Sequence, residues 1–507
     1  MSGKVRTLDE LGAIAAAARA RGQKVVLAHG VFDILHVGHK RHLDAGKQHG
    51  DLLIVTLTTD RHVNKGPDRP VFPEQLRAEM VAAFESVDHV GISPNPGAEH
   101  VLEIVRPSFY LKGSEYADEE KDVTGRIRSE RQIVEKHGGE MLFTEDITFS
   151  SSNISNRVLQ LYPEETAAYL KELRTRITAE DLHREVERAR DKRYLLIGDT
   201  ILDEYVYVEP LGKPAKENII ATRYTGREIF AGGAIATANL VAQFCREVDL
   251  VTLLGREDSR EDFIRRSLHP NVRLVPFYRS KGQTTLKSRL VDPTYIKKLI
   301  EIAYLSDEPL PAGEQGALNG WVEGHIGDYD GVIVNDFGHG MIDGGLIDLV
   351  CRKAPFLAVN AQTNSANRGF NLITKYPRAD FICIDEPETR LAAVDRFSPL
   401  ESVVRDKLEK RIDCHAFVVT HGKHGSIVCT PQAGVRRIPA LTGEAIDTIG
   451  AGDAFFALAA PLVAAGSDPF LAAFIGNAAG AMKVRIVGQR HQITKPEILK
   501  YLSTLMK

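Results

Sequence analysis

Short apolar runs alternate with amphipathic stretches along the first third of the chain. Lys24–Ala28 and Leu52–Leu57 are almost continuously apolar, whereas Glu74–Phe84 carries its apolar residues at helical spacing. Strands without polar alternation are typical of a parallel sheet that helices cover on both faces. The alternation of such strands with helices predicts a doubly wound α/β unit.

Two pairs of residues mark the starts of helices. Thr7 with Glu10, and Thr178 with Asp181, have the spacing of capping boxes. The segment Glu164–Arg190 is rich in Glu, Arg, Lys and Ala and contains no glycine, so we expect two charged helices that bridge two domains. A nucleic-acid-binding helix is the alternative interpretation, and the mixed charge of the segment disfavours it.

A second series of apolar runs follows residue 190. The stretches 205–227 and 287–304 are instead polar and β-like, and we expect a small sheet that covers the site. We therefore predict an α/β protein with a Rossmann-like domain over 1–160, a helical linker over 161–190, and an α/β domain with a small β lid over 191–507. The strands expected in the last part are Tyr194–Gly198, Val248–Leu254, Gly331–Asn335, Phe356–Asn360, Phe381–Ile384 and Ala416–Thr420.

Composition narrows the class of protein. A chain of 507 residues is too long for one ordinary core, so two or more domains are expected. A net charge of −4 gives no basic surface for nucleic acid, and five widely spaced cysteines predict reduced, mostly buried thiols. The N-terminus is charged where a signal peptide is apolar, and the longest apolar stretch, Ala454–Ala465, is shorter than the ~20 residues that span a bilayer. These features predict a cytoplasmic enzyme without a nucleic-acid or membrane partner.

The first motif that carries chemistry is His29-Gly-Val-Phe-Asp-Ile-Leu-His-Val-Gly-His39. It follows a predicted strand, so His36 and His39 should lie at the start of a helix, where two imidazoles can face one anion and Gly38 lets a phosphate approach the backbone. Donors placed there stabilise the charge that nucleotidyl transfer moves onto pyrophosphate. A pair of structural or metal-binding histidines is the alternative, and no acidic or cysteine partner with ligand spacing supports a metal.

Three further stretches extend this motif to a family resemblance. Together with Gly30–His36, the stretches Lys65–Pro73 with Arg77, Leu111–Tyr116 and Phe149–Ile154 resemble the cytidylyltransferase-like superfamily. The resemblance covers roughly residues 22–160. It is strongest to the adenylyltransferase half of the bifunctional heptose-phosphate enzymes that make ADP-heptose, and glycerol-phosphate cytidylyltransferases are the next closest kin.

The resemblance implies roles for individual residues. His36, His39 and Lys65 would act on the triphosphate as catalytic residues, and Asp33 would lie near the sugar phosphate or organise its loop. His29 replaces the usual Asn, and Ser-Ser-Ser replaces the usual Ser-Thr-Thr. Whether the nucleotide is ATP or CTP stays open, because backbone contacts hold the base. The other implied residues are Gly30, Phe32, Gly38, Ser150, Ser151 and Ser152 for the nucleotide, and Lys112 for the substrate.

The second motif is Asp447-Thr-Ile-Gly-Ala-Gly-Asp-Ala-Phe455. Gly450, Ala451 and Gly452 can offer three successive backbone N–H groups to a phosphoryl group at a helix start. Asp453 follows directly and is placed to accept the proton of an acceptor hydroxyl. The alternative is a glycine-rich turn with an aspartate N-cap, which the length of the motif disfavours.

This string resembles the signature of the ribokinase-like (PfkB) carbohydrate kinases, and stretches throughout residues 191–507 agree with it. The resemblance implies that Asp203 and the pair Gly232-Gly233 bind the substrate. Val334–Gly340 is similar to the family's Asp-Tyr-x-Lys-Gly loop. The residues implied to surround the nucleotide are Thr420 and Gly422 in Thr420–Gly425, Gly450, Ala451 and Gly452 in the signature, and Asn477.

Departures from the kinase pattern concern the sugar and the metal. Ala236 stands where the family has an Asn that touches sugar hydroxyls, and His339 stands where Lys is usual. The Asn that helps to hold magnesium is replaced by Asp385, whereas Glu388 is kept. We expect Asp385 and Glu388 to bind Mg²⁺, and we expect the acceptor to differ from heptose 7-phosphate or to bind with altered contacts. The kinase lies last in this chain, whereas it lies first in the heptose enzymes.

The leading hypothesis is one polypeptide with two activities. An ATP- and Mg²⁺-dependent kinase would phosphorylate a sugar or sugar phosphate, and the transferase would join a sugar phosphate to ATP or CTP, making an ADP-heptose-like product and releasing pyrophosphate. One alternative is a cytidylyltransferase for a polyol or other sugar phosphate whose kinase domain has a different activity or serves only dimerisation or sensing. Another is a purely regulatory nucleotide-binding protein. A homodimer through the kinase lid is expected from the resemblance.

Overall fold

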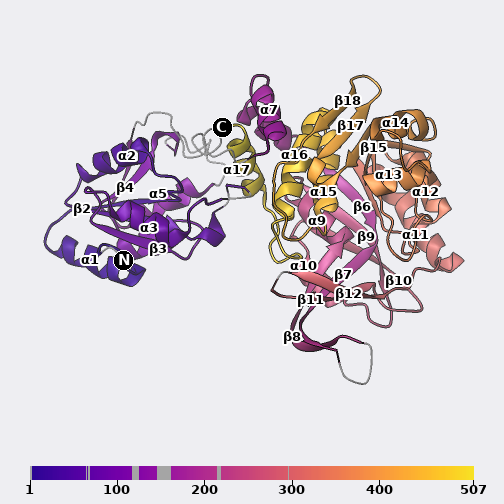
Figure 1. Ribbon diagram of the computed structural model, residues 1–507, viewed down its shortest axis with the longest axis horizontal. Helices are drawn as coiled ribbons and strands as arrows, with labels where there is room; N and C mark the ends of the chain where they lie inside the picture. Colours follow the sequence, from indigo (N-terminus) through magenta and orange to yellow (C-terminus); the bar gives the residue numbers. More distant parts are fainter. Residues whose placement is uncertain are drawn as a thin grey trace. The chain divides into compact units, whose positions relative to one another are not determined.

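The chain folds into two compact units. The computed structural model describes residues 3–63, 65–66, 69–116, 125–144, 162–213, 219–294 and 296–507 (Figure 1). One unit contains Met1–Ala167 together with Pro496–Lys507, and the other contains Ala168–Lys495. Residues 496–507 thus group with the first unit, although the sequence led us to assign them to the kinase domain.

The first unit is built on a five-stranded parallel sheet in the order β3-β2-β1-β4-β5, as a doubly wound domain requires. Side chains of β1 alternate between two cores: Val26 and Ala28 belong to one apolar cluster, and Val25 and Leu27 to the other. This two-sided burial explains the unbroken apolar run in the sequence. The strands are β1 (Val25–Gly30), β2 (Leu52–Thr58), β3 (His89–Ser93), β4 (Phe109–Gly113) and β5 (Glu140–Thr144).

The predicted capping box at the N-terminus is confirmed. The Thr7 hydroxyl accepts from the N–H of Glu10 (3.3 Å), and the Glu10 carboxylate accepts from the N–H of Thr7 (2.7 Å), so the first helix starts where the sequence indicated. The helices are α1 (Leu8–Ala20), α2 (Val37–Lys47), α3 (Glu74–Ala82), α4 (Glu99–Val105) and α5 (Arg126–Lys136), and α17 (Lys495–Leu505) groups with them apart from its first residue.

The predicted linker region forms two helices. These are α7 (Glu164–Leu173) and α8 (Ala179–Glu187). The capping box of Thr178 and Asp181 is present at the start of α8, with an oxygen-to-nitrogen distance of 3.2 Å between the Thr178 hydroxyl and the N–H of Asp181. Within the second unit, Tyr169 on α7 lies 6.2 Å from Phe474, centroid to centroid.

A nine-stranded sheet forms the centre of the second unit, in the order β10-β9-β6-β13-β14-β15-β16-β17-β18. The pairs from β10 to β16 are parallel, and β17 and β18 add antiparallel strands at one edge. The strands are β6 (Arg193–Gly198), β9 (Glu247–Gly255), β10 (Val272–Arg279), β13 (Gly331–Asp336), β14 (Leu357–Ala361), β15 (Arg378–Asp385), β16 (Asp413–Thr420), β17 (Ser426–Thr430) and β18 (Gly434–Ile438).

Helices cover both faces of this sheet. In Figure 1, α9, α15 and α16 lie on one side, and α11, α12 and α13 lie on the other. Every residue from Ala454 to Val463 is buried, so this apolar stretch of the sequence forms a core helix. The helices are α9 (Ala234–Ala242), α10 (Glu261–Ser267), α11 (Ala312–His325), α12 (Gly344–Lys353), α13 (Glu386–Ala393), α14 (Leu400–Ser402), α15 (Ala451–Ala464) and α16 (Pro469–Lys483).

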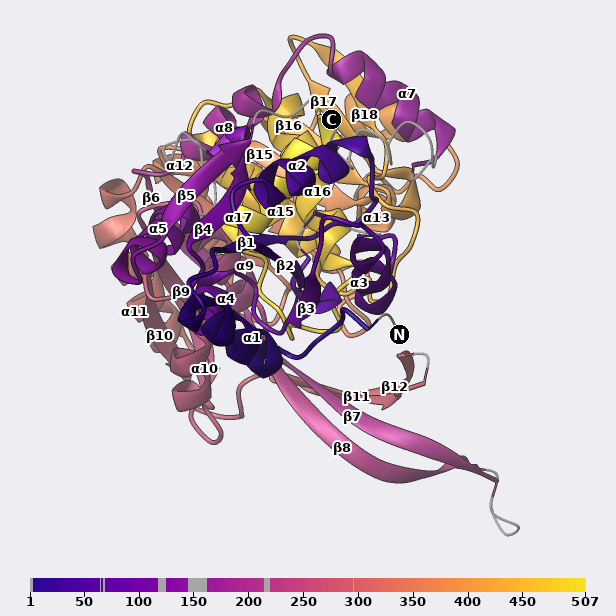
Figure 2. The ribbon, with the colours of Figure 1, turned by 90° about the vertical axis from the view of Figure 1, so that its left-hand side faces the viewer.

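A separate four-stranded sheet, which we call the lid sheet, has the order β12-β11-β7-β8. Figure 2 shows β7 and β8 running out as a long ribbon from the rest of this unit. The two polar, β-like stretches of the sequence therefore do form one small sheet. Its strands are β7 (Thr200–Gly212), β8 (Ala221–Gly233), β11 (Leu286–Asp292) and β12 (Lys297–Tyr304).

In each unit, parallel strands end at residues that the sequence singled out. Gly30 ends β1, and Asp336, Asp385 and Thr420 end β13, β15 and β16. Ligands of open α/β sheets bind outside the carboxyl ends of the strands. The fold thus gathers at these edges the residues that the sequence singled out.

Candidate active sites

The histidine pair of the first unit lies at the N-terminus of α2. His36 is the N-cap residue, and its Nδ1 accepts the N–H of Gly38 at 3.1 Å, so the neutral ring carries its proton on Nε2. The ring centroids of His36 and His39 are 4.0 Å apart. The structure therefore brings the two imidazoles together at a helix start, where backbone N–H groups favour an anion.

His39 is a neutral, half-enclosed donor in the absence of substrate. Burial lowers its pKa to about 3, and the charges of His36, Lys65 and His42 lower it further. Its buried Nδ1 has no hydrogen-bond partner among the described residues. An anion placed beside this ring would favour the protonated form, because an opposite charge raises the pKa of a histidine.

Asp33 organises the loop that carries Lys65. Its fully buried carboxylate forms an ion pair with Arg69 (3.1 Å) and accepts the N–H of Val71 (2.6 Å). Burial lowers the pKa of Lys65 to about 8, and the charge of Asp33 opposes that shift. Of the two roles that the resemblance left open for Asp33, these contacts support the structural one.

Other predicted residues of this unit line the same edge of the sheet. Phe32 has φ 49°, and its ring centroid lies 5.4 Å from that of His39. A Cβ on Gly30 would approach the Phe32 ring to 3.2 Å, so the glycine makes room for it. Lys112 pairs with Glu130 at 2.7 Å. Ser150, Ser151 and Ser152 lie outside the described residues.

Arg77 has a structural role that the sequence did not indicate. Its buried guanidinium donates to the carbonyls of Phe72 (2.9 Å), Thr58 (2.8 Å) and Val31, and it pairs with Asp60 (2.6 Å). Val31 lies in the loop after β1, Thr58 ends β2 and Asp60 follows it, and Phe72 lies in the loop before α3. One side chain therefore fixes three loops around the histidine pair.

The glycine-rich motif of the second unit opens α15. Gly450 is the N-cap residue with φ 78°, a left-handed conformation that glycine adopts without strain. The N–H of Ala451 contacts Thr448 O at 3.4 Å, whereas those of Gly450 and Gly452 have no acceptor within the described part of the chain. Two of the three predicted N–H groups are thus available to an anion at the helix start.

Asp453 lies beside these N–H groups and has the environment of a general base. Gln362 donates to its Oδ1 at 2.5 Å. Burial raises the pKa of Asp453 to about 6, the charge of Asp203 raises it further, and Gln362, Lys483 and Asn335 lower it. The carboxylate is therefore ionised at neutral pH and remains more basic than an exposed aspartate.

Asp203 and the diglycine are in direct contact. A Cβ on Gly232 would lie 2.2 Å from Oδ2 of Asp203, so only glycine leaves room for this carboxylate. Gly233 has φ 54° and caps α9. Arg289 from β11 forms an ion pair with the other oxygen of Asp203. The predicted substrate residues thus meet an arginine of the lid sheet that the sequence analysis did not single out.

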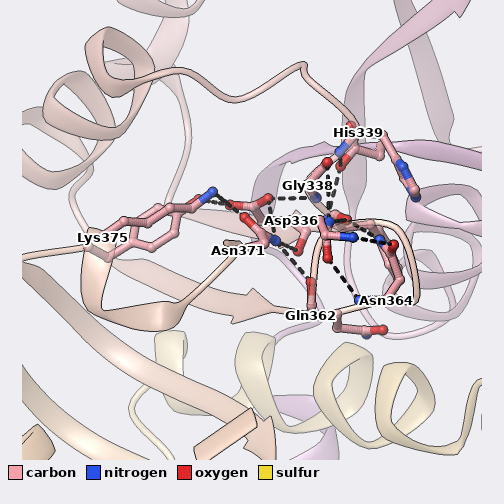
Figure 3. A network of polar contacts seen from close by, with 11 residues as sticks. Asp336, Gly338, His339, Gln362, Asn364, Asn371 and Lys375 are labelled. Carbon is pink, nitrogen blue, oxygen red and sulfur yellow. Dashed lines mark hydrogen bonds and ion pairs between the residues drawn. The ribbon is translucent and has the colours of Figure 1, made fainter. Parts of the chain in front are cut away.

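The loop after β13 is held by a buried polar network (Figure 3). Asp336 accepts from the Tyr376 hydroxyl (2.6 Å) and pairs with Lys375 (2.6 Å). Asp199 accepts the N–H groups of Phe337 (3.0 Å) and His339 (3.4 Å), and burial raises its pKa to about 7. The imidazole of His339, which replaces the usual lysine, extends away from this network in Figure 3.

The two predicted metal ligands form the capping box of α13. Oδ1 of Asp385 accepts the N–H of Glu388 (2.8 Å), and Oε2 of Glu388 accepts the N–H of Asp385 (2.9 Å). Burial and then the charge of Asp385 raise the pKa of Glu388 to about 8. Two adjacent carboxylates that resist ionisation together suit a hard divalent cation, and Mg²⁺ sites use one or two carboxylates beside water and phosphate. The pair therefore fits Mg²⁺, and no larger cluster of acidic, His or Cys ligands occurs among the described residues.

The predicted nucleotide side lies at β16 and α16. Thr420 ends β16, and Gly422 follows with φ 52°. The Asn477 amide contacts the carbonyls of Ile438 and Pro439 at 3.4 Å each, so it ties α16 to the end of β18. These contacts give Asn477 a structural role, in addition to any contact with a nucleotide.

A cavity lies against Asp453. Gly450 and Asp453 from α15, Ala236 from α9 and Lys483 from the end of α16 form part of its wall. Ala236, for which the resemblance implied a place beside the sugar, thus lines the same cavity as Asp453. Lys483 was not anticipated, and its only signal was a single charge at the end of an apolar helix.

Asp447 connects the glycine-rich motif to the lid sheet. Its buried carboxylate accepts from Lys298 Nζ on β12 (2.6 Å), the Tyr205 hydroxyl on β7 (2.9 Å) and the N–H of Gly488 (2.9 Å). Lys298 Nζ also lies 5.5 Å from the centroid of the Tyr205 ring. We call Lys298, Tyr205 and Asp447 the lid latch.

Comparisons with known proteins agree with the two motifs. The family described as cytidylyltransferase-like matches residues 27–157, and the pfkB family of carbohydrate kinases matches residues 370–496. The bifunctional protein HldE of Geobacter metallireducens is 36% identical over 168 residues, which is 32% of this chain and 32% of that protein. HldE of Hahella chejuensis is 38% identical over 137 residues, or 27% of each chain. The chain thus spans about a third of the length of these curated relatives.

One solved structure supports the fold of the second unit. Phosphofructokinase-2 from Escherichia coli, in complex with potassium, matches with a TM-score of 0.50 and 14% identity, covering 63% of this chain and 100% of that one.

Within the described residues, no helix has the length and apolar character needed to cross a bilayer. All five cysteines are free, as predicted, and four of them are buried. The chain therefore carries a cytidylyltransferase-like domain in its N-terminal part and a pfkB-family carbohydrate kinase domain in its C-terminal part.

Proposed function

We propose that this chain is a bifunctional transferase. The C-terminal domain phosphorylates a sugar or sugar phosphate, and the N-terminal domain joins a sugar phosphate to a nucleotide with release of pyrophosphate. The observation that carries the proposal is that each domain holds its own phosphate-facing set. One set is the pair of imidazoles 4.0 Å apart at the start of α2, and the other is a half-buried carboxylate beside the N–H groups that open α15.

The transferase step needs charge stabilisation and no covalent intermediate. An oxygen of the sugar phosphate attacks the α-phosphorus of ATP or CTP, and the bond to the leaving pyrophosphate breaks. His36 donates through Nε2–H, and His39 gains a proton as the triphosphate arrives, so both offset the charge on the leaving group. Lys65 adds a cation from the loop that Asp33 holds.

The kinase step uses Asp453 as its base. The proton of the acceptor hydroxyl passes to the Asp453 carboxylate, the new oxygen–phosphorus bond forms on the γ-phosphorus of ATP, and ADP leaves. Gly450 and Gly452 donate backbone N–H groups to the transferring phosphoryl. Asp385 and Glu388 would hold Mg²⁺, which when bound neutralises phosphate charge.

The proposal extends to assembly and location. The lid sheet exposes several large apolar side chains, for example Tyr224 (61%), Ile300 (59%) and Ile302 (46%). An exposed apolar patch on a sheet favours pairing with another copy, so we propose a homodimer through the lid sheet. Use of ATP and five free thiols fit a cytoplasmic enzyme without nucleic-acid or membrane partners.

Two substitutions test the division of labour. Purified full-length protein is assayed with ATP or CTP and a panel of sugars, sugar phosphates and sugar 1-phosphates, while pyrophosphate and ADP are measured separately. His39→Ala is expected to abolish pyrophosphate release and leave ADP formation near normal, and Asp453→Asn is expected to do the reverse. His49→Ala and Asp348→Asn, both exposed, are the matched controls.

The outcomes are easy to separate. Loss of both activities in either folded variant would contradict two independent sites. Absence of ADP formation with every acceptor, alongside normal pyrophosphate release, would leave the chain a nucleotidyltransferase with a non-catalytic kinase domain. Heptose 7-phosphate as the best acceptor by a wide margin would show that Ala236 leaves the specificity of related heptose kinases unchanged.

A further inference from the structure

Lys483 is a buried cation at the C-terminal end of α16. Its residue is only 3% exposed, and its Nζ donates to the carbonyl of Gly488 at 2.6 Å. An ammonium group has three N–H donors, and this is the one hydrogen bond it makes within the described residues. Burying a charge with two donors unused is costly unless another group approaches it.

The ammonium group faces the catalytic motif. A Cβ built on Gly450 would lie 3.3 Å from Cε and 4.0 Å from Nζ of Lys483, so the lysine lies over the first residue of the motif. Lys483, Gly450 and Asp453 also line the same cavity. The two unused donors therefore lie at the cavity in which an acceptor must present its hydroxyl to Asp453.

The segment after Lys483 supplies a further part of the cavity wall. Gln489 and Gln492 line the cavity, and Nε2 of Gln489 would lie 3.6 Å from a Cβ on Gly450. Asn239 on α9 also lines the cavity, so amide groups from two segments lie beside the cation.

We propose that Lys483 is an acceptor-binding residue of the kinase: it donates to the oxygen of the reacting hydroxyl while that proton passes to Asp453. This inference rests on the proposed kinase activity and adds a residue to it. The oxygen then forms its bond to the γ-phosphorus, and the bond to ADP breaks with its electrons going to ADP. The cation offsets the negative charge that the oxygen carries as its proton leaves.

The charged groups around Asp453 make the role measurable. Asp203 from β7 faces it with a negative charge and Lys483 from α16 with a positive one, while Gln362 and Asn335 are neutral. Removing the lysine removes a positive charge that lowers the pKa of Asp453, so this pKa rises. Because Asp453 must be ionised to act, the acid limb of the kinase rate then moves to higher pH.

The experiment compares Lys483→Met with Lys483→Arg in the full chain. For the Met variant we expect the acid limb of the pH profile of kcat/KM to move to higher pH by roughly one unit. We also expect the KM for the acceptor to rise roughly tenfold, with little change in the KM for ATP. The Arg variant keeps the charge, so its acid limb should stay at the wild-type pH. Lys353→Met, at an exposed lysine on α12, controls for loss of a surface charge.

A second measurement is independent of turnover. Selective ¹³C labelling of aspartate carboxyls, assigned with Asp453→Asn, gives the pKa of Asp453 in protein without acceptor. An upward shift of the pKa of Asp453 in Lys483→Met supports the proposal even if no acceptor in the panel is phosphorylated. The lack of any phosphorylated acceptor would count only against the proposed kinase activity. The proposal would be overturned if a folded Lys483→Met variant kept the wild-type acid limb of kcat/KM, the wild-type KM for the acceptor and the wild-type pKa of Asp453. If the Met variant does not fold, Lys483→Gln takes its place.

Discussion

At the scale of single residues, Asp453 would set the pH range of the proposed kinase. Its pKa is raised to about 6 chiefly by burial, so the base loses its charge as pH falls through 6. We expect kcat/KM of the kinase to be constant between pH 7 and 8 and to fall tenfold per unit below pH 6. Asp453→Asn should lower turnover by roughly 10²–10⁴-fold between pH 7 and 8, and by less below pH 6, where the wild-type base is itself protonated. A pH–rate profile with product quantified by ADP release checks both statements, and a variant with half of wild-type turnover would remove Asp453 from this role.

Individual residues differ in how far the sequence specifies them. His36, His39 and Asp453 were identified because their motifs place them next to a helix start, a local relation that spacing encodes. Lys483 and Gln362 were missed because their relation to Asp453 depends on the packing of distant elements. Asp33 was recognised without its role, which is decided by its contact with Arg69 and not by any feature of its own motif.

At the scale of elements, the lid latch joins the lid sheet to α15. Lys298→Met leaves the buried Asp447 carboxylate without one of its donors, at a cost of ~1–3 kcal/mol. We expect the lid to open more often, which lowers kcat/KM for the acceptor and increases hydrolysis of ATP by water. Lys297→Met, at the exposed neighbouring position on β12, is the matched control.

Two measurements distinguish an effect on the lid latch from a general loss of stability. Thermal unfolding and acceptor-free ATP hydrolysis are measured for both variants and for Lys298→Arg, which keeps the charge. If Lys298→Met and the wild type couple ATP use to acceptor phosphorylation equally well, closure of the lid does not depend on this contact.

The capping box of α13 allows the metal role of Glu388 to be tested apart from its structural role. Glutamine also completes a capping box, so Glu388→Gln removes the charge and keeps the cap. We expect its unfolding temperature to stay close to wild type while the Mg²⁺ concentration for half-maximal kinase rate rises roughly 10–100-fold. Glu388→Ala should lose stability as well. An unaltered Mg²⁺ dependence in the Gln variant would assign Glu388 to the cap alone.

Element prediction succeeded where one physical signal dominates. Strands buried on both faces were located from their apolar runs, and each capping box marked a true helix start. The lengths of β7 and β8 and the antiparallel edge of β17 and β18 were not foreseen, since edge and lid strands are half-exposed and carry a mixed pattern.

At the scale of the whole molecule, residues 496–507 belong to the first unit. The side chain of Tyr501 is buried there, and a Cβ on Gly66 would clash with its ring at 2.0 Å, so α17 packs against the loop that carries Lys65. We predict that a variant ending at Lys495 loses pyrophosphate release and keeps the kinase, because 168–495 form a unit of their own. Tyr501→Ala should destabilise the first unit by about 3 kcal/mol.

Tyr501→Phe is the control, since it keeps the ring against Gly66. Pyrophosphate and ADP release are measured for all three variants, and unfolding is followed for the two substitutions. Full transferase activity in the chain ending at Lys495 would show that α17 is not needed by the site. The sequence could not reveal this grouping, because domain boundaries are judged along the chain and this contact joins residues from its two ends.

The place of α17 has a consequence for the order in which the protein is made. A ribosome releases residues 1–167 first, yet the helix that packs on the Lys65 loop is translated only after the entire second unit. A nascent or prematurely terminated chain therefore exposes the first unit without that helix. Nucleotide transfer would begin only in molecules whose kinase has already been synthesised, which keeps the two activities in equal number in the cell.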